Sequence, residues 1–192
     1  LIIVGKEYKF GKNQSGNTDT LYELGKKYGT DCVFLDKLKD GNGIDISSSR
    51  IRELIKTGNP AKVACFLNEP YSLEGIVIHG DKLGRELGFP TINIKTVNEV
   101  IPLNGVYAAK VKINGILYGA MAYIGNRPAI AEKTELRIEA NIFDFNSDVY
   151  GADAEIFFYE YIRGDMKFAS LNDLINNMKG DKNKAVKILG NL

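Results

Sequence analysis

The chain has 192 residues, which suits one mid-sized domain or two small ones, and its 44% hydrophobic and 26% charged residues are typical of a globular protein. Its 25 Lys and Arg residues nearly balance its 24 Asp and Glu residues, so no global positive field favours nucleic acid. No apolar run approaches the roughly 18 residues of a membrane span and no secretory signal is recognisable, so we expect a cytoplasmic protein without nucleic-acid or membrane partners.

The first part of the chain alternates strand and helix patterns. Residues 1–4 are a continuous apolar run, typical of a buried parallel strand, and residues 32–35 predict the next strand. A helix that ends at Gly29 is predicted between them, and two more helices are predicted after them. This order predicts a partial Rossmann-like α/β sheet in residues 1–69. Because the chain begins within a strand pattern and not with Met, we expect its N-terminal part to be incomplete.

Residues 70–192 follow a different pattern, with short strands separated by turns rich in Gly, Asn and Pro. The pair Asn114-Gly115 is a strong signal for a two-residue hairpin. Several short strands without intervening helices predict an antiparallel barrel or sandwich. Two C-terminal helices are expected, one that begins at Ser170 and a short last one around Ala185. The predicted strands are residues 73–79, 91–94, 105–113, 116–124, 135–145 and 154–162.

The most unusual stretch is residues 79–93, between two predicted strands. Such a loop can bring backbone N–H groups close to phosphate oxygens, because glycine accepts positive φ and has no Cβ. The pattern matches neither a Walker A loop nor G-x-G-x-x-G. Glycine spacing alone therefore favours an ordinary strand connection with solvated charges. The glycines and cations of the loop are Gly80, Gly84, Gly88, Lys82 and Arg85.

Two polar pairs on strand faces add chemistry to this loop. Thr91 and Asn93 are two residues apart, so they share a strand face, and their neutral oxygens suit Mg²⁺ together with substrate phosphates. The alternative is an ordinary polar strand face. Glu139 alternates with Ile138 and Ala140, and a carboxylate there could accept a proton from an attacking hydroxyl. Taken alone, Glu139 fits a solvated strand residue better.

These residues together resemble a known family. The string Gly80-x-x-x-Gly84-Arg85-x-x-Gly88-Phe89-Pro90-Thr91-x-Asn93 is similar to the signature of riboflavin kinases, especially the kinase half of bacterial bifunctional riboflavin kinase/FAD synthetases. The resemblance covers the whole chain. Further matching motifs are Gly105-Val106-Tyr107-Ala108, Ile124-Gly125-Asn126-Arg127-Pro128, Asp148-x-Tyr150-Gly151 and Arg163-x-x-x-Lys167-Phe168-x-Ser170-Leu171.

The resemblance implies a six-stranded antiparallel barrel with a C-terminal helix, and it implies a role for each matching residue. Thr91 and Asn93 would hold Mg²⁺ and phosphate, and Glu139 would be the catalytic base for the terminal ribityl hydroxyl. Many relatives have His two residues after this Glu, where the present chain has Asn141. The phosphate-binding flap would include Gly80, Lys82, Gly84, Arg85 and Gly88. The flavin-binding residues would be Asn126, Arg127 and Arg163.

The N-terminal part resembles the end of the FMN adenylyltransferase half of such enzymes. Ser47, Ser48, Ser49 and Arg52 match a motif in which hydroxyl groups at a helix N-terminus and an arginine hold ATP phosphates. Without the resemblance, a well-capped helix with an exposed arginine explains them better. That half relies on a His-x-Gly-His-type motif, and the single histidine of the chain, His79, belongs to the kinase part. The chain by itself is therefore not expected to adenylylate FMN.

The resemblance predicts a riboflavin kinase that converts ATP and riboflavin into ADP and FMN. It also predicts a bifunctional parent protein that makes FAD and pyrophosphate from FMN and ATP. The expected oligomeric state is a monomer or a weak homo-oligomer. The alternative is a non-catalytic barrel that binds flavin or nucleic acid, since small closed barrels also bind oligonucleotides. The near-neutral charge argues against nucleic acid, and intact Thr91, Asn93 and Glu139 argue against a non-catalytic protein.

Overall fold

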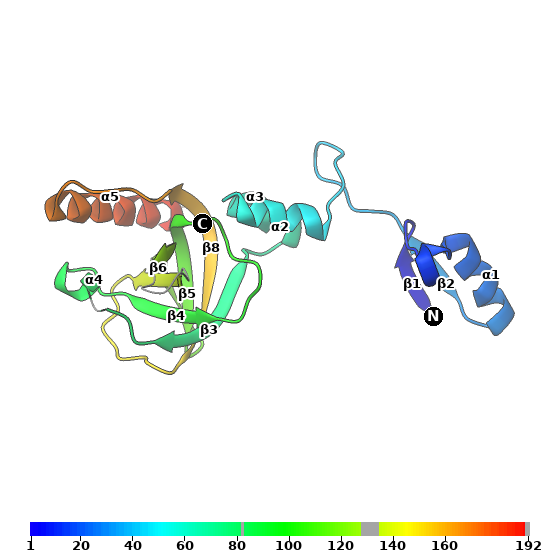
Figure 1. Cartoon of the computed structure of the whole chain (residues 1–192), viewed down its shortest axis with the longest axis horizontal. Coiled ribbons are helices and arrows are strands. Elements are labelled where there is room, and N and C mark those ends of the chain that lie inside the picture. The colour runs from blue at the N-terminus through cyan, green and yellow to red at the C-terminus, as the bar shows by residue number, and fades with distance from the viewer. Residues whose placement is uncertain (82, 128–134, 191–192) are drawn as a thin grey trace. The chain divides into compact units, whose positions relative to one another are not determined.

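The computed structural model describes residues 1–81, 83–127 and 135–190, and its contacts divide the chain into two compact units, Leu1–Arg50 and Ile51–Leu192 (Figure 1). The predicted boundary at residues 69 and 70 lies later than this division. Helix α3 (Pro60–Leu67) packs against the last strand of the barrel, and the Leu103 N–H donates to the Ile55 carbonyl at 3.2 Å. These contacts explain why the segment before residue 69 is grouped with the barrel.

The first unit contains a single β-α-β arrangement. The strands β1 and β2 pair in parallel with Ile2 opposite Cys32. Helix α1 joins them and ends at Gly29, whose φ of 65° is the left-handed conformation that glycine adopts readily, as predicted. Among the described residues, the partial Rossmann-like sheet predicted for residues 1–69 is represented by these two parallel strands alone, and its assignment to a Rossmann-like domain stays a prediction. The elements are β1 (Ile2–Gly5), the 3-10 helix η1 (Lys12–Gln14), α1 (Thr18–Tyr28) and β2 (Cys32–Leu35).

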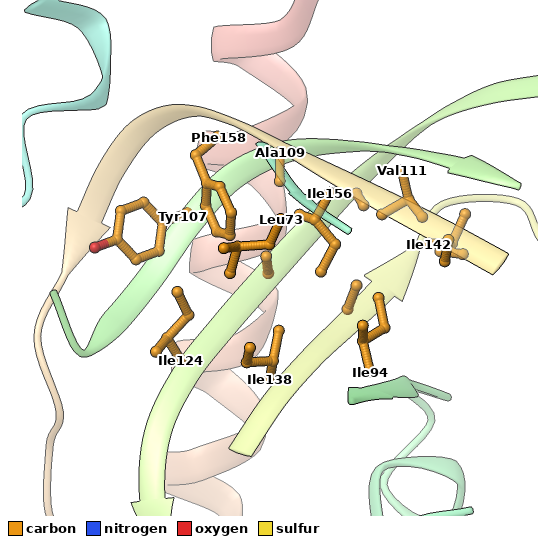
Figure 2. Packing of buried hydrophobic residues seen from close by; sticks show 14 of the residues in the cluster. Leu73, Ile94, Tyr107, Ala109, Val111, Ile124, Ile138, Ile142, Ile156 and Phe158 are labelled. Atoms are coloured by element: carbon orange, nitrogen blue, oxygen red, sulfur yellow. The ribbon is translucent and has the colours of Figure 1, made fainter. Parts of the chain in front are cut away.

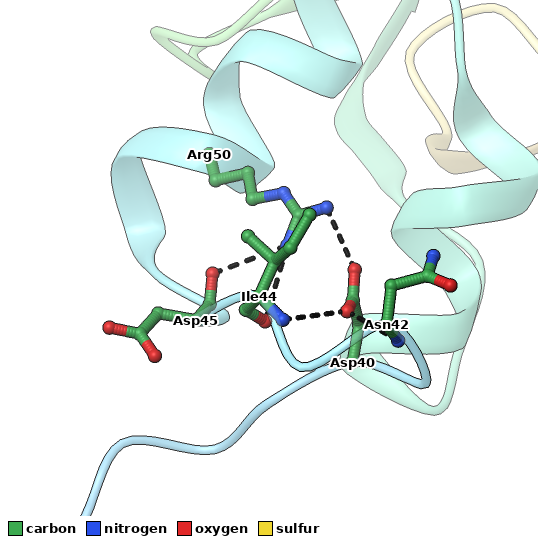
Figure 3. Close-up of polar contacts among 5 residues, drawn as sticks. All are labelled: Asp40, Asn42, Ile44, Asp45 and Arg50. Atoms are coloured by element: carbon green, nitrogen blue, oxygen red, sulfur yellow. Dashed lines mark hydrogen bonds and ion pairs between the residues drawn. The ribbon is translucent and has the colours of Figure 1, made fainter.

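A polar turn precedes helix α2 (Ser48–Lys56), and Figure 3 shows its contacts. The Asp40 carboxylate accepts from the backbone N–H groups of Asn42 at 2.9 Å and Ile44 at 3.0 Å. Arg50 Nη2 lies 2.8 Å from the second oxygen of the same carboxylate, and its Nη1 donates to the Ile44 and Asp45 carbonyls. The backbone N–H of Ile44 and the Arg50 cation lower the pKa of the Asp40 carboxyl, because both stabilise its ionised form.

The second unit is a closed six-stranded antiparallel barrel, as predicted, with neighbouring strands in the order β3-β4-β7-β6-β5-β8. The hairpin between β5 and β6 turns at Asn114 and Gly115, which both have positive φ, as the type I′ turn requires. The strands are β3 (Ser72–Ile78), β4 (Ile92–Thr96), β5 (Gly105–Ile113), β6 (Ile116–Arg127), β7 (Glu135–Ile142) and β8 (Asp153–Arg163).

Alternate residues of every strand fill the barrel with apolar side chains (Figure 2). The Tyr107 and Phe158 rings pack edge to face with centroids 5.2 Å apart, and Leu73, Ile124 and Ile138 are buried in the same cluster. The barrel interior is therefore a packed core. A ligand must bind on the outer face of the barrel or at its ends.

The prediction of two C-terminal helices was wrong. The C-terminal region is one helix, α5 (Leu171–Gly190), which packs on β5, β6 and β8 and continues through Gly180 (Figure 1). It continues because Asp181 and Ala185, on the next turn, are both buried against the barrel. The loop of residues 79–93 contains a single helical turn, α4 (Leu83–Glu86). No described helix has the length and apolar character needed to cross a membrane.

Candidate active site

A cavity of about 340 Å³ lies on the outer face of the barrel, over β4, β6 and β7. Ile138 and Ala140 point into the barrel core, so Glu139 between them points outward into the cavity. The loop between β3 and β4, which contains α4 and is called the flap below, closes one side of the cavity. The segment after β8 and helix α5 close the other. The cavity is therefore walled by four separate parts of the chain.

Polar groups gather at one end of the cavity, where β4 meets β7. Asn93 lies directly opposite Glu139 in the register of these two strands, and Thr91 lies two residues before Asn93. Asn141 is only 4% exposed, and its Nδ2 donates to the Pro90 carbonyl at 2.7 Å. This bond fixes the turn that leads into Thr91. Hydroxyl, amide and carboxylate groups thus line the same end of the cavity.

The flap approaches these strands closely because two of its residues are glycines. A Cβ on Gly80 would overlap the Asn93 amide, and a Cβ on Gly84 would overlap the Phe89 carbonyl. Gly88 has a φ of 81°, which other residues rarely adopt. Glycine is therefore needed at positions 80 and 84 so that the backbone can approach its neighbours, and at position 88 for the turn.

One arginine joins the flap to the carboxylate at the centre of the site. Arg137 Nη2 lies 2.5 Å from Asp81 Oδ2, and its Nη1 lies 3.2 Å from Glu139 Oε1. Burial raises the pKa of the Glu139 carboxyl above its usual value, Arg137 opposes this rise, and Asp81 adds to it. The Glu139 carboxylate is thus partly desolvated, as suits a general base.

Tyr123 covers the same end of the cavity from β6. It lies opposite Glu139 in the β6–β7 register, and its ring lies over Gly125, where any Cβ would overlap the phenol oxygen. Burial, followed by a hydrogen bond with Asp165 and the charges of Asp165 and Glu139, raises the pKa of Tyr123 to about 12. Tyr123 is therefore a neutral hydroxyl at physiological pH.

The end of the cavity formed by the segment after β8 and by α5 is apolar except for Asp165 and one ion pair. Arg163 Nε and Nη2 lie 2.8 Å and 2.7 Å from Asp181 Oδ2, so the end of β8 is tied to the middle of α5. The Arg163 guanidinium also lies over the Phe168 ring. This end suits a flat, largely apolar ligand. The apolar lining residues are Leu87, Val106, Met121, Met166, Phe168, Leu174 and Met178.

A second cavity of about 510 Å³ lies on the other side of Thr91. Arg85, Pro90 and Tyr150 line it, and Thr91 lines both cavities. A narrower space that is lined by Gly80, Arg85 and Asn93, among others, lies next to it. Two ligands could therefore meet at Thr91 and Asn93, one from each cavity.

Thr91 and Asn93 are suitable ligands for a small divalent cation. Their hydroxyl and amide oxygens are neutral, hard donors, and both residues line the first cavity. No group of three or more His, Cys, Asp or Glu side chains that could hold a metal occurs among the described residues. With only two protein donors, Mg²⁺ would take its remaining ligands from water and substrate phosphates.

The structure brings seven of the predicted site residues together. Gly84, Thr91, Asn93, Glu139 and Arg163 all line the first cavity. Gly80 and Arg85 line the spaces beyond Thr91, and Gly88 lies in the turn that follows α4.

The remaining predicted residues lie elsewhere. Lys82 lies outside the described residues, as does the side chain of Arg127, and Asn126 is exposed near the end of β6. Ser47 accepts from the Arg50 N–H at 3.3 Å and caps helix α2, as the simpler interpretation predicted. The exposed residues of that motif are Ser48, Ser49 and Arg52.

Sequence reasoning missed Tyr123, Asp165 and Asp181. The signal for Asp181 was present, because it follows Leu174 and Met178 at helical spacing on the apolar side of α5. A carboxylate at such a position requires a partner. No comparable signal marks Tyr123 or Asp165, since a tyrosine in a strand and an aspartate in a loop are ordinary.

The chain is similar to several known proteins. A family model described as riboflavin kinase matches residues 67–189. The bifunctional riboflavin kinase/FMN adenylyltransferase of Bacillus subtilis is 38% identical over 194 residues, which cover 99% of this chain and 60% of that protein. The protein of the same name from Haemophilus influenzae is 37% identical over 177 residues and is covered to 56%. The chain thus spans about 60% of the length of these relatives.

One solved structure matches nearly the whole chain. It is a Streptococcus pneumoniae protein described as a macrolide-efflux protein, with 34% identity and a TM-score of 0.83. The match covers 94% of this chain and 59% of that one. This likeness shows that the two chains share a fold.

Proposed function

Because the chain belongs to the riboflavin kinase family, we propose that it transfers the γ-phosphate of ATP to the terminal ribityl hydroxyl of riboflavin, which yields FMN and ADP. The observation that carries this proposal is that Glu139 lies opposite Asn93 in the first cavity, which Thr91 also lines, and that Thr91 lines the second cavity as well. A nucleophile from the first cavity and a phosphate from the second would meet there.

Glu139 is the proposed base. The ribityl oxygen forms a bond to the γ-phosphorus, the bond between that phosphorus and the bridging oxygen of ADP breaks, and the hydroxyl proton passes to the Glu139 carboxylate. Phosphoryl transfer has a loose transition state, so the main task of such a base is to orient the hydroxyl. Arg137, at 3.2 Å, holds the carboxylate in place for this task.

The nucleotide is proposed to enter from the second cavity and to lie under the flap. Arg85 lines that cavity, and the glycine at position 80 lets the flap backbone approach Asn93. Backbone N–H groups of such a loop suit phosphate oxygens. The proposed phosphate-binding residues are Gly80, Lys82, Gly84, Arg85, Gly88, Thr91 and Asn93.

Mg²⁺ is proposed to bind to Thr91 and Asn93. When bound there, it would neutralise part of the phosphate charge. The role of the two side chains is to hold the ion and the phosphates next to Glu139. The fit rests on their donor chemistry and on the glycine at position 80, which lets the flap backbone lie against the Asn93 amide.

The isoalloxazine ring is proposed to lie at the apolar end of the first cavity. Methionine and phenylalanine side chains there suit a flat aromatic ligand, and Arg163 adds hydrogen-bond donors. By resemblance, Asn126 and Arg127 are also proposed to contact the flavin. The ribityl chain would then extend from the ring to Glu139.

The remaining proposals concern the longer protein. We assign residues 1–69 to the end of a Rossmann-like FMN adenylyltransferase domain and residues 70–192 to the kinase domain. The support is the β-α-β arrangement of the first unit and the longer bifunctional relatives. In that context, Ser47, Ser48, Ser49 and Arg52 would hold ATP phosphates, and the parent protein would also make FAD. A cytoplasmic location and a monomeric or weakly oligomeric state are proposed as well.

The test is to incubate the chain with riboflavin, ATP and Mg²⁺ and to measure FMN and ADP by chromatography. The expected result is FMN and ADP in equal amounts, with strong loss in Glu139→Gln. Glu160→Gln is the matched control, because Glu160 is an exposed glutamate of β8. Absence of FMN with the folded wild-type chain would exclude kinase activity. Riboflavin binding without turnover would then favour a non-catalytic flavin-binding barrel.

A further inference from the structure

Asp181 is the most deeply buried charged group of the described residues, and its partner lines the cavity. It is 3% exposed, in the middle of α5, and two nitrogens of Arg163 contact its Oδ2. Arg163 Nη1 also donates to the Gly164 carbonyl at 2.9 Å. The guanidinium therefore has its plane and direction fixed from two sides.

This pair is not explained by stability alone. Burying two charges is costly, and replacing a buried ion pair with apolar residues is often neutral or stabilising. Ala185, one turn after Asp181, is a buried apolar residue of the kind that usually packs between a helix and a barrel. A buried carboxylate at this position therefore indicates a requirement for a fixed arginine in the cavity.

The charge and the hydrogen-bond donors of Arg163 limit the kinds of ligand that it can bind. The pair carries no net charge, so it does not attract a phosphate as a free arginine would. Arginine has five N–H donors, and the hydrogen bonds among the described residues occupy three of those on Arg163. The others suit neutral carbonyl acceptors. The neighbouring Met166, Phe168 and Met178 suit the faces of a flat ring.

We propose that Asp181 is a positioning residue for flavin recognition: it orients Arg163 so that the guanidinium hydrogen-bonds the carbonyl oxygens at the pyrimidine edge of the isoalloxazine ring. This inference rests on the proposed function. It makes α5 a part of the substrate site, because the helix carries the residue that aims the arginine. It also separates ring recognition, at this end of the cavity, from phosphate transfer at the Glu139 end.

The first experiment compares Asp181→Asn with the wild-type chain in steady-state kinase assays. Asparagine keeps the shape but removes the charge that holds Arg163. The KM for riboflavin should rise about 10- to 100-fold, the loss expected for a charged hydrogen bond, while kcat and the KM for ATP stay within about threefold. Arg163→Lys keeps the charge but lacks the planar fork, and it should show the same selective rise.

The second readout is discrimination between flavins. In 2-thio- and 4-thioriboflavin, sulfur, a weaker acceptor, replaces one of the two ring carbonyl oxygens. The wild-type chain should prefer riboflavin over at least one of them, and Asp181→Asn should lose most of this preference. A purely structural role of Asp181 would lower the affinity for all three flavins equally.

The control for a structural role is Ile188→Ala. Ile188 packs in the cluster that holds α5 on the barrel, away from the ion pair. It should lower Tm without a selective change in the KM for riboflavin. The proposal is overturned if Asp181→Asn has a normal KM for riboflavin, or if both substrates lose affinity as stability falls. If Asp181→Asn does not fold, a normal KM in Arg163→Lys overturns it.

Failure of the proposed function is distinguishable from failure of this inference. If the wild-type chain makes no FMN, only the kinase assignment fails. Riboflavin binding, followed by quenching of flavin fluorescence, then decides the role of Asp181 in the same variants. Equal dissociation constants for wild type and Asp181→Asn overturn the inference.

Discussion

Asn93 of β4 and Glu139 of β7 lie directly opposite each other on the outer face of the barrel. In such a pair the two Cβ atoms are about 4.5–5.5 Å apart, so the strand ladder itself sets the spacing between them. The proposed metal ligand and the proposed base are therefore held by two paired strands of the barrel. The flap and α5, in contrast, supply the walls around them.

Glu139→Gln should abolish most activity without a loss of stability. We expect kcat to fall about 10²- to 10⁴-fold because the amide cannot take the proton. Burial raises the pKa of Glu139, so the folded state disfavours the ionised carboxylate, and at neutral pH a neutral glutamine should leave the free energy of unfolding equal or higher. Urea unfolding and steady-state kinetics test both parts. A large loss of stability would contradict this account of Glu139.

Gly80→Ala should impair the kinase because the new Cβ would overlap the Asn93 amide. Either the flap or Asn93 must move, and both lie at the proposed phosphate site. We expect kcat/KM for ATP to fall at least roughly tenfold, since small displacements of reacting groups are costly. Gly41→Ala is the control, because a Cβ there meets nothing within 4 Å. Equal activity of the two variants would show that the closeness of the flap is unimportant.

Substitutions that remove the charge of Arg137 or of Asp81 should shift the acid limb of the pH–activity profile in opposite directions. The base acts when it is ionised, so kcat/KM should fall as the pH drops through the Glu139 pKa, which lies above its usual value. Arg137 lowers this pKa and Asp81 raises it. Arg137→Met should therefore move the limb to higher pH, and Asp81→Asn should move it to lower pH. Shifts in the same direction would refute the assigned electrostatics.

Alkaline pH should destabilise the barrel through Tyr107. Its hydroxyl donates to the Leu103 carbonyl, and burial raises its pKa well above the ordinary value of about 10. Below about pH 10 both folded and unfolded states keep the proton, and the contribution to stability is complete. As the pH rises towards the folded pKa, the unfolded chain releases a proton that the folded chain retains, so the free energy of unfolding falls. Urea unfolding at about pH 8 and pH 11 should show this fall, and Tyr107→Phe should reduce it.

Much of the barrel could be predicted because its signals are local. The Asn114-Gly115 turn and the alternation of apolar residues identify strands without knowledge of their partners. Closure of the barrel followed only from the family resemblance, since strand order depends on contacts between distant segments. The short helix α4 could not be predicted, because Gly84 lies within it and glycine is a poor helix former.

In the candidate site, too, some residues could be predicted from local signals and others could not. Thr91, Asn93 and Glu139 could be predicted, since strand alternation places each side chain on a known face. The ion pairs of Arg137 with Asp81 and of Arg163 with Asp181 join residues far apart in the chain, and charge spacing does not reveal them. The single helix α5 could not be predicted, because Gly180 lies within it and burial of the following turn outweighs the cost of a glycine, which is about 1 kcal/mol.

The closure of the barrel also affects how the protein associates with itself. Every barrel strand has a neighbour on both sides, whereas in the described part of the chain β1 and β2 pair only with each other and carry exposed apolar residues such as Ile3 and Leu35. Unpaired edges are templates for strand addition and aggregation. Precipitation of this chain on storage should therefore start in the first unit. Charged substitutions at Ile3 or Leu35 should improve its solubility more than any change on the barrel.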